Sequence, residues 1–161
     1  MELIIFIGLQ ASGKSTFYQI HCSETYEPYE HISMDLLKNN KNPRKRQLVL
    51  LEAALQAQKS VVIDNTNPTI EDRQPLIQLG RQYGAKITGY YFESDVRQCI
   101  KRNKQREGKA RVPDVAIYTT AKKMIHPAYE EGFDILYDVS IGENNTFIVR
   151  KWVEEEITPL Q

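Results

Sequence analysis

The 161 residues are enough for one domain with a sizeable core, and 41% hydrophobic and 26% charged residues are ordinary values for a globular protein. The formal net charge of zero excludes a global field that would draw the chain to nucleic acid or to a membrane. No apolar run is long enough to span a bilayer, and no signal peptide is evident. We therefore expect one cytoplasmic domain over residues 1–161, without membrane association.

The most informative motif is a phosphate loop at residues 8–16, Gly-Leu-Gln-Ala-Ser-Gly-Lys-Ser-Thr. It follows the apolar residues 3–7 and precedes a segment that can be helical, which is the strand–loop–helix context of G-x-x-x-x-G-K-[ST]. Its glycines let backbone N–H groups turn inward around phosphate oxygens, and the helix dipole adds positive charge. The motif predicts binding of a nucleoside triphosphate, with Lys14 on the β/γ-phosphates and the Ser15 hydroxyl on Mg²⁺. The predicted nucleotide-binding residues of this loop are Gly8, Ala11, Ser12, Gly13, Lys14, Ser15 and Thr16.

Strand and helix patterns alternate along the rest of the chain. Further strands are predicted at residues 31–34, 60–64, 86–92, 134–139 and 146–149. Helices are predicted over 48–55, from a capping box at 69–72 towards 84 with a kink at Pro75, from 94–95 into the basic residues 101–111, and from Pro113 to about 126. Residues 22–30 are interpreted as a connection and residues 154–161 as a frayed tail. The alternation predicts a three-layer α/β fold of the P-loop type around a mainly parallel sheet, with the loops after the strands gathered at one edge.

Asp35 follows the second predicted strand, which we expect to lie directly beside the phosphate loop. A carboxylate there could take the proton from an attacking hydroxyl group, and positioned general bases contribute about 10²–10⁴ in rate. Alternatively, Asp35 belongs to the cap of a helix that begins near Leu36. The spacing alone does not separate the two interpretations.

Asp64 ends the buried run Val-Val-Ile-Asp, the pattern of a carboxylate that holds Mg²⁺ directly or through water. The alternative is a turn-forming aspartate before Asn65, because such side chains commonly bond the local backbone. We favour the metal or phosphate-loop role, since an enzyme with a phosphate loop needs an acidic partner at a strand end.

Two basic segments accompany these carboxylates. Residues 101–111 are the densest, and an arginine that closes over a triphosphate contributes about 10³–10⁵ in rate. We expect a lid over roughly residues 101–125. Residues 38–46 follow Asp35 and suit an acceptor that carries phosphates of its own. For both segments, a solvated surface is the alternative interpretation.

His31, His126 and Trp152 have no partner at a spacing that suggests metal ligation or catalysis, and we interpret them as structural.

Taken together, these motifs resemble the polynucleotide 5′-hydroxyl kinase family. The resemblance rests on the phosphate loop, on Ser33-Met-Asp35, on Asp64-Asn-Thr-Asn-Pro68 followed by Arg73, and on residues 101–106 leading to Val112-Pro-Asp114. It implies ATP with Mg²⁺ as the phosphoryl donor and the 5′-hydroxyl end of a polynucleotide as the acceptor. By the same resemblance, Asp35 is the general base, Arg106 is the lid arginine on the ATP phosphates with Arg102 as a second candidate, and Asp64 braces the phosphate loop and the acceptor pocket.

One position departs from the family pattern. Lys38 stands where the family has an arginine one helical turn after the base, so the charge is kept but the bidentate fork is lost. The predicted acceptor residues are Asp35, Lys38, Asp64 and Arg73. Because the neutral chain offers no long nucleic-acid groove, we expect a short or single-stranded end as substrate.

Two other functions fit the same motifs. A P-loop kinase of a small metabolite would use the same base and lid on any hydroxyl group. A P-loop ATPase or switch that is not a kinase is disfavoured, because no Asn-Lys-x-Asp string is present and a general base favours transfer over hydrolysis. The sequence leaves the oligomeric state open.

Overall fold

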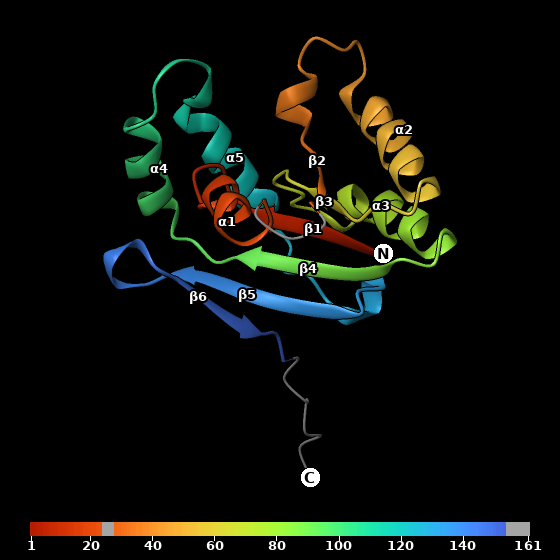
Figure 1. The fold of residues 1–161 in the computed structure, drawn as a ribbon. Coiled ribbons are helices and arrows are strands. Elements are labelled where there is room, and N and C mark those ends of the chain that lie inside the picture. Colours follow the sequence, from red (N-terminus) through yellow and green to blue (C-terminus); the bar gives the residue numbers. More distant parts are fainter. Residues whose placement is uncertain (24–27, 154–161) are drawn as a thin grey trace.

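One six-stranded sheet carries the fold (Figure 1), as shown by a computed structural model that describes residues 1–23 and 28–153. The strand order is β2-β3-β1-β4-β5-β6, and all neighbours are parallel except β6, which is antiparallel to β5. The strands are β1 Glu2–Gly8, β2 Glu30–Ile32, β3 Val61–Ile63, β4 Lys86–Phe92, β5 Ile135–Ile141 and β6 Phe147–Lys151. The predicted mainly parallel α/β fold is confirmed. The predicted tail at 154–161 and residues 24–27 of the predicted connection lie outside the described residues.

The helices follow the predicted alternation, with two shifted boundaries. They are α1 Lys14–His21, α2 Pro43–Gln56, α3 Ile70–Gln82, α4 Val96–Lys104 and α5 Asp114–Lys123, with short 3₁₀ turns η1 Met34–Leu37, η2 Gly108–Ala110, η3 Tyr129–Glu131 and η4 Glu143–Asn145. Helix α2 begins earlier than predicted, because the Asn42 side chain accepts from the Lys45 N–H and Pro43 suits the first turn. Helix α4 ends at Lys104, so residues 105–111 of the basic segment 101–111 lie outside it.

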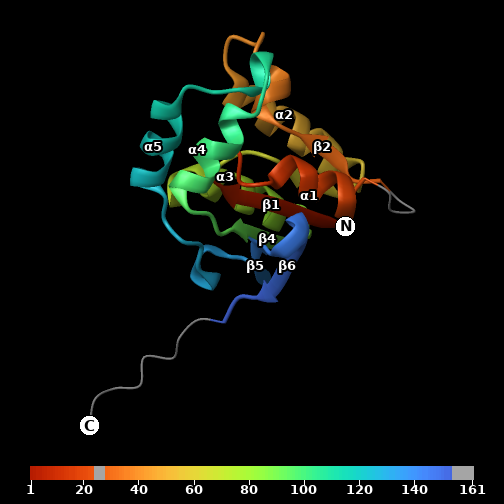
Figure 2. The ribbon, with the colours of Figure 1, turned by 90° about the vertical axis from the view of Figure 1, so that its left-hand side faces the viewer.

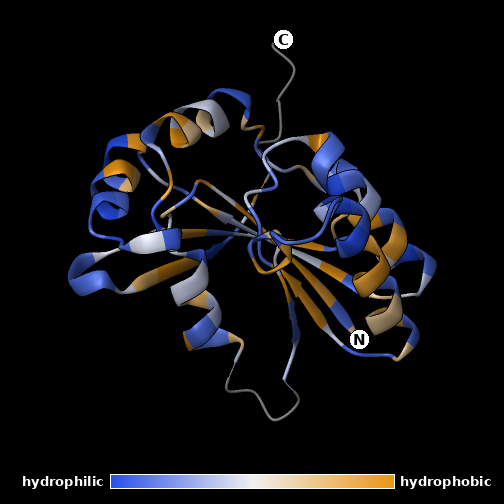
Figure 3. Cartoon of the chain, turned by 90° about the horizontal axis from the view of Figure 1, so that it is seen from above, coloured by the Kyte–Doolittle hydropathy of each residue, from blue (hydrophilic) through white to orange (hydrophobic). Residues whose placement is uncertain are grey.

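Alternate side chains of β1 pack into two separate cores. Leu3, Ile5 and Ile7 face α2 and α3, whereas Ile4 and Phe6 pack with aromatic residues of α1. This burial on both faces explains why β1 is continuously apolar. In Figure 3, hydrophobic strands lie in the middle, and the helices around them carry both hydrophilic and hydrophobic residues. Within the described parts of the chain, no helix is long and apolar enough to cross a membrane.

The strand order corrects one prediction about the sheet. The strand before Asp35 is predicted directly beside the phosphate loop, but β3 lies between β2 and β1. The burial of the strands explains the order: β3 is buried along its whole length and occupies the interior, whereas β2 is exposed at Glu30 and forms the edge. Asp64 is therefore next to the phosphate loop, and Asp35 is one strand further out.

The elements around the phosphate loop form two walls. Helices α4 and α5 lie side by side in both Figure 1 and Figure 2, while η1 and α2 stand on the other side of the loop in Figure 1. A third apolar cluster, which includes Leu9, Cys99 and Ile117, fixes the phosphate loop to α4 and α5. The carboxyl ends of β1, β2 and β3 open between these walls.

Candidate active site

The backbone of the phosphate loop takes conformations that its sequence allows. Gly13 has φ = 100° at the N-cap of α1, in the left-handed region that favours glycine. A Cβ on Gly8 would lie 2.8 Å from Phe92 Cβ, so the close approach of β1 and β4 requires a glycine there. Ala11 also has a positive φ of 62°, which is costly for a residue with a Cβ. The loop thus opens onto the N-terminus of α1, where backbone N–H groups favour anions.

Lys14 is held inside this loop. Its side chain is only 9% exposed, and its Nζ donates to the carbonyl oxygens of Gly8 at 3.1 Å and Leu9 at 2.6 Å. Burial lowers the pKa of Lys14 to about 8, although the nearby Asp64 carboxylate acts to raise it. A buried cation of this kind gains most from a polyanionic ligand that replaces its lost hydration.

A cleft of about 570 Å³ opens in front of the loop, between the two walls. This volume is within the range of about 300–1,000 Å³ that is usual for small-molecule sites. The sequence-predicted residues that line it are Ala11, Lys14, Ser15, Asp35, Lys38, Asp64 and Arg106. The fold thus brings together, from four separate segments, most of the side chains to which the sequence assigned chemistry.

Asp64 is buried at the back of the cleft and is oriented by a histidine. His31 Nε2 and Asp64 Oδ2 lie 2.9 Å apart, and the His31 ring stacks on Tyr18 with 4.0 Å between ring centroids. This contact joins β2, β3 and α1 beneath the phosphate loop. No local spacing indicates this partner of His31, because Asp64 lies 33 residues further along the chain.

The rest of the Asp64 turn, residues 64–67, ties the wall formed by η1 and α2 to β1. The Asn65 side chain accepts from the Met34 N–H of η1 at 2.8 Å and donates to Gln47 of α2. The Thr66 carbonyl accepts from the Gly8 N–H at 3.0 Å, and the Asn67 amide donates to the Phe6 carbonyl at 2.8 Å. The motif is therefore a hub that positions the phosphate loop and η1 relative to each other, and the sequence analysis missed the roles of both asparagines.

Arg73 supports this hub from beneath and does not face the cleft. Its side chain is 0% exposed, and its guanidinium donates to both carboxylate oxygens of Glu131, at 2.8 and 3.1 Å. Nη1 also donates to the Asn67 carbonyl at 3.0 Å. This position does not agree with the prediction of Arg73 as an acceptor residue, because the side chain is 0% exposed, is paired with Glu131 and does not line the cleft.

Asp35 lies at the rim of the cleft. Its side chain is 87% exposed, and Lys38 Nζ lies 3.9 Å from Asp35 Oδ1. This solvent-screened ion pair contributes little to stability. The cap of η1 is formed by Ser33, whose Oγ accepts from the Asp35 N–H at 3.2 Å. Capping therefore uses the backbone of Asp35 and leaves its carboxylate available.

The two lid arginines differ in what they contact. Arg106 follows α4, lines the cleft and donates to the Ala110 carbonyl at 3.3 Å. Arg102 does not line the cleft, because its Nε donates to the Ala11 carbonyl at 2.7 Å and so braces the phosphate loop. The fully buried Asn103 pairs with both backbone groups of Val112, at 2.6 and 3.0 Å, and closes the lid segment at its base.

The donor atoms of the cleft fit Mg²⁺ as it binds beside a nucleotide. Among residues 1–23 and 28–153, no cluster of three or more His, Cys, Asp or Glu side chains could hold a metal ion alone. Mg²⁺, however, commonly takes one or two protein oxygens together with waters and substrate phosphates. Ser15 and Asp64 both line the cleft and can supply such oxygens.

The parallel sheet and the strand–loop–helix around Lys14 define a P-loop domain of the α/β class. The chain belongs to the AAA_33 family, whose model is described as an AAA domain and matches residues 3–127.

Relatives and solved structures support this assignment. The chain is 30% identical over 141 residues to the bifunctional polynucleotide phosphatase/kinase of Schizosaccharomyces pombe, and the match covers 86% of this chain and 33% of that protein. Its fold is similar to that of a gluconokinase from Sinorhizobium meliloti 1021, with 17% identity and a TM-score of 0.64 over 88% of this chain and 83% of the other. It is also similar to that of a fungal RNA kinase, with 17% identity and a TM-score of 0.66 over 89% of this chain and 40% of the other. The resemblance to the polynucleotide 5′-hydroxyl kinase family is confirmed. The chain spans about a third of the length of the phosphatase/kinases that it matches.

Proposed function

We propose that this domain transfers the γ-phosphoryl group of ATP, with Mg²⁺, to the 5′-hydroxyl end of a polynucleotide. The observation that carries the proposal is the cleft itself, in which an exposed carboxylate, Asp35, shares one opening with the buried Lys14 of the phosphate loop. A base across from a phosphate-binding cation is the arrangement that phosphoryl transfer needs. The similarity to polynucleotide phosphatase/kinases supports the choice of acceptor.

The donor side of the reaction uses fixed charges. The N–H groups of the phosphate loop and the Lys14 ammonium would hold the β- and γ-phosphates, and Arg106 would approach them from the lid. Ser15 and Asp64 are the residues that would hold Mg²⁺, which neutralises charge on the phosphates when it is bound. Because these groups are already in position, little reorganisation is needed when negative charge develops.

The acceptor side uses Asp35 as the base. Its carboxylate oxygen would accept the proton of the 5′-hydroxyl group. In the same step the 5′-hydroxyl oxygen would form a bond to the γ-phosphorus, and the bond between the γ-phosphorus and the leaving ADP oxygen would break. Lys38 stands beside it and would attract a phosphate of the acceptor as a point charge. The exposure of both residues leaves room for the end of a polymer to approach.

The proposal is tested with γ-labelled ATP and Mg²⁺ offered to 5′-hydroxyl DNA and RNA oligomers, to the same oligomers with a 5′-phosphate, and to a panel of small hydroxyl metabolites. We expect label on the 5′-hydroxyl oligomers alone, and its loss in Asp35→Asn but not in Glu143→Gln, a matched change at an exposed carboxylate of η4. Label on metabolites alone would replace the polynucleotide acceptor by a small molecule. Release of phosphate without any labelled acceptor would indicate an ATPase.

A further inference from the structure

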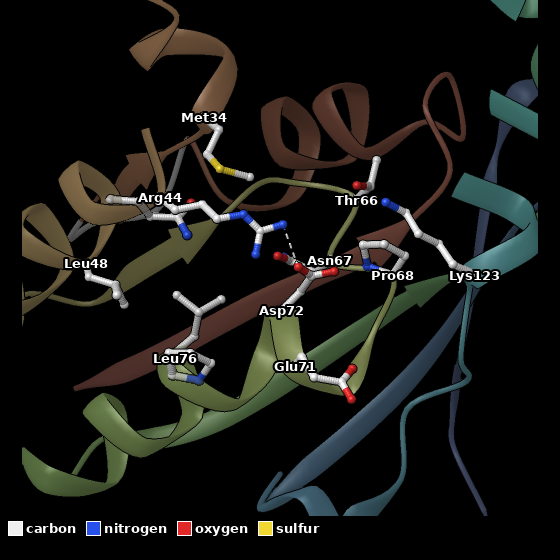
Figure 4. Close-up of a pocket in the computed structure, with 12 residues that line it drawn as sticks. Met34, Arg44, Leu48, Thr66, Asn67, Pro68, Glu71, Asp72, Leu76 and Lys123 are labelled. Carbon is white, nitrogen blue, oxygen red and sulfur yellow. Dashed lines mark ion pairs between the residues drawn. The ribbon is translucent and has the colours of Figure 1, made fainter. Parts of the chain in front are cut away.

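A second pocket, of about 150 Å³, lies next to the cleft, and none of the steps proposed above uses it. Figure 4 shows its walls: Met34 comes from η1, Leu48 from α2, Pro68 from the loop after β3, and Leu76 from α3. Met34 and Thr66 line both the pocket and the cleft. Because Met34 directly precedes Asp35 in the chain, the pocket adjoins the side of the cleft where the acceptor is expected.

The pocket combines apolar side chains with polar groups, among them Glu71, Lys123 and a polar edge formed by Arg44 and Asp72. The Met34 thioether and the Leu48, Pro68 and Leu76 side chains offer flat or adaptable hydrocarbon surfaces. The polar edge is the ion pair between Arg44 Nη2 and Asp72 Oδ1, which lie 2.6 Å apart (Figure 4). A ligand of this pocket therefore needs two apolar faces and a hydrogen-bonding rim.

Within the polar edge, Asp72 is fixed in place and charged. Burial acts to raise the pKa of Asp72, but hydrogen bonds from Thr69 and Arg44 outweigh it and hold the pKa below its ordinary value. Asp72 also closes the capping box of α3, because its Oδ2 accepts from the Thr69 N–H at 3.2 Å. Arg44 is exposed on its outer side and can turn its planar guanidinium towards a ring or towards an acceptor atom.

We propose that this pocket binds the nucleobase of the nucleotide that carries the acceptor hydroxyl, an inference that rests on the proposed function. An unstacked base presents two apolar faces and a polar edge, and proteins commonly hold such bases against apolar side chains and arginine planes. The volume of about 150 Å³ suits one ring system and excludes a longer stretch of polymer. The pocket then anchors the terminal nucleoside while its 5′-oxygen reaches towards Asp35.

Two other ligand classes fit the walls less well. A phosphate would meet the Glu71 and Asp72 carboxylates at the lining, and of the two cations there, Arg44 and Lys123, Arg44 is already paired with Asp72. A sugar would leave several hydroxyl groups unpaired against Leu48 and Leu76, and buried polar groups without partners are costly. The pocket thus favours the aromatic part of a nucleotide.

The first experiment compares a 5′-hydroxyl oligomer with the same oligomer whose terminal nucleotide is abasic. For the wild type, we expect loss of the base to raise KM about tenfold with little change in kcat, since stacking is worth about 1–3 kcal/mol per base.

Leu48→Trp fills the pocket and should raise KM for the intact oligomer to the abasic value without affecting the abasic oligomer. Val49→Trp is the matched control, because Val49 is the next residue of α2, is 49% exposed and does not line the pocket. Equal KM values of the wild type for the two oligomers would overturn the proposal, as would an equal effect of Leu48→Trp on both.

The second experiment measures binding without transfer. An oligomer with 2-aminopurine at its 5′-terminal position is titrated with the protein in the presence of a non-hydrolysable ATP analogue. We expect a fluorescence change with the wild type and Val49→Trp that is lost with Leu48→Trp, and no such difference when the probe is placed several nucleotides from the end. If the fluorescence of the terminal probe changes as expected but no label is transferred, the proposed function is wrong and the assignment of the pocket to a nucleobase is retained. If label is transferred and the terminal probe does not respond, the pocket assignment fails and the function stands.

Discussion

The two halves of the candidate active site are built differently. The donor half, which comprises the phosphate loop and the Asp64 turn, is largely buried, and the Lys14, Asp64 and Asn67 side chains there have hydrogen-bond partners. The acceptor half, which comprises η1 with Asp35 and Lys38, is exposed, and its one ion pair is long and screened by solvent. The difference indicates that the donor half is organised before substrate arrives, while the acceptor half is ordered by its ligand.

The comparison is tested most directly at Asp35. Asp35→Asn should lower kcat by about 10²–10⁴, because the amide cannot accept the proton of the acceptor hydroxyl. ATP affinity and thermal stability should be unchanged, since the side chain is 87% exposed and the cap is made by Ser33. Steady-state kinetics, nucleotide titration and thermal unfolding check the three quantities. A loss of ATP affinity equal to the loss of kcat would contradict the separation of the two halves.

In the donor half, the largest effect on stability is expected at Arg73. Arg73→Met should lower the free energy of unfolding by about 3–5 kcal/mol, because it leaves the buried Glu131 carboxylate without its partner. The Asn67 carbonyl loses a donor at the same time, so the Asp64 turn should loosen. Chemical denaturation measures the change.

Arg81→Met is the matched control for this experiment. Arg81 is half-exposed on the same helix and pairs with Asp134 at 3.2 Å, so its loss should cost less than about 1 kcal/mol. Equal destabilisation by the two variants would show that the buried pair is not what holds the hub.

Arg73 also illustrates which features of the molecule could be predicted from the sequence. The strand, loop and helix at the N-terminus are contiguous, so the pattern of residues 3–16 contains both the local structure and its chemistry. Arg73 stands five residues after the Asp64 turn and was interpreted as an acceptor residue, but its partner Glu131 lies 58 residues further along. Nothing local distinguishes a cation that is buried and paired from one that faces a substrate.

The same limit applies to His31 and to the order of the strands. Ring stacking on Tyr18 and the hydrogen bond to Asp64 depend on which strands become neighbours, and periodicity predicts strands but not their order. The short β2, with its exposed Glu30, did contain a sign of an edge position. That Asp35 and Lys38 lie near each other could be predicted from the sequence, because both belong to one short segment.

His31 provides the next test of the donor half. His31→Ala should raise the Mg²⁺ concentration required for half-maximal activity by about 10–100-fold, because the Asp64 carboxylate loses the hydrogen bond that orients it. His31→Gln, which can donate at a similar position, should recover part of the loss. Tyr18→Phe keeps the stacked ring and serves as the control. A variant that is merely less stable, with an unchanged Mg²⁺ requirement, would return His31 to a purely structural role.

The smallest effect concerns the proton on Lys14. Its pKa of about 8 in the free protein lies below the ordinary value of 10.5. Between pH 8 and 10.5 the unfolded chain therefore binds a proton that the folded chain lacks. In this range the free energy of unfolding contributed by Lys14 increases as pH rises. Nucleotide phosphates favour the ammonium and raise the pKa in the complex. Below pH 8, Lys14 is already charged and affinity does not depend on its titration. Above pH 8, binding requires uptake of a proton, so Kd for ATP should rise about tenfold per pH unit until the pKa of the complex is reached.

Titration with a fluorescent ATP analogue across this pH range measures the slope, and calorimetry in two buffers of different ionisation enthalpy measures the proton taken up. Lys14→Arg stays charged throughout and should give a flat profile even where its affinity is lower. Lys59→Ala, a change at an exposed lysine after α2, should keep the wild-type slope. A flat wild-type profile through pH 8 to 9 would mean that the buried ammonium keeps its ordinary pKa, and the donor half would then owe its affinity for phosphate to the N–H groups of the loop more than to a cation held ready inside it.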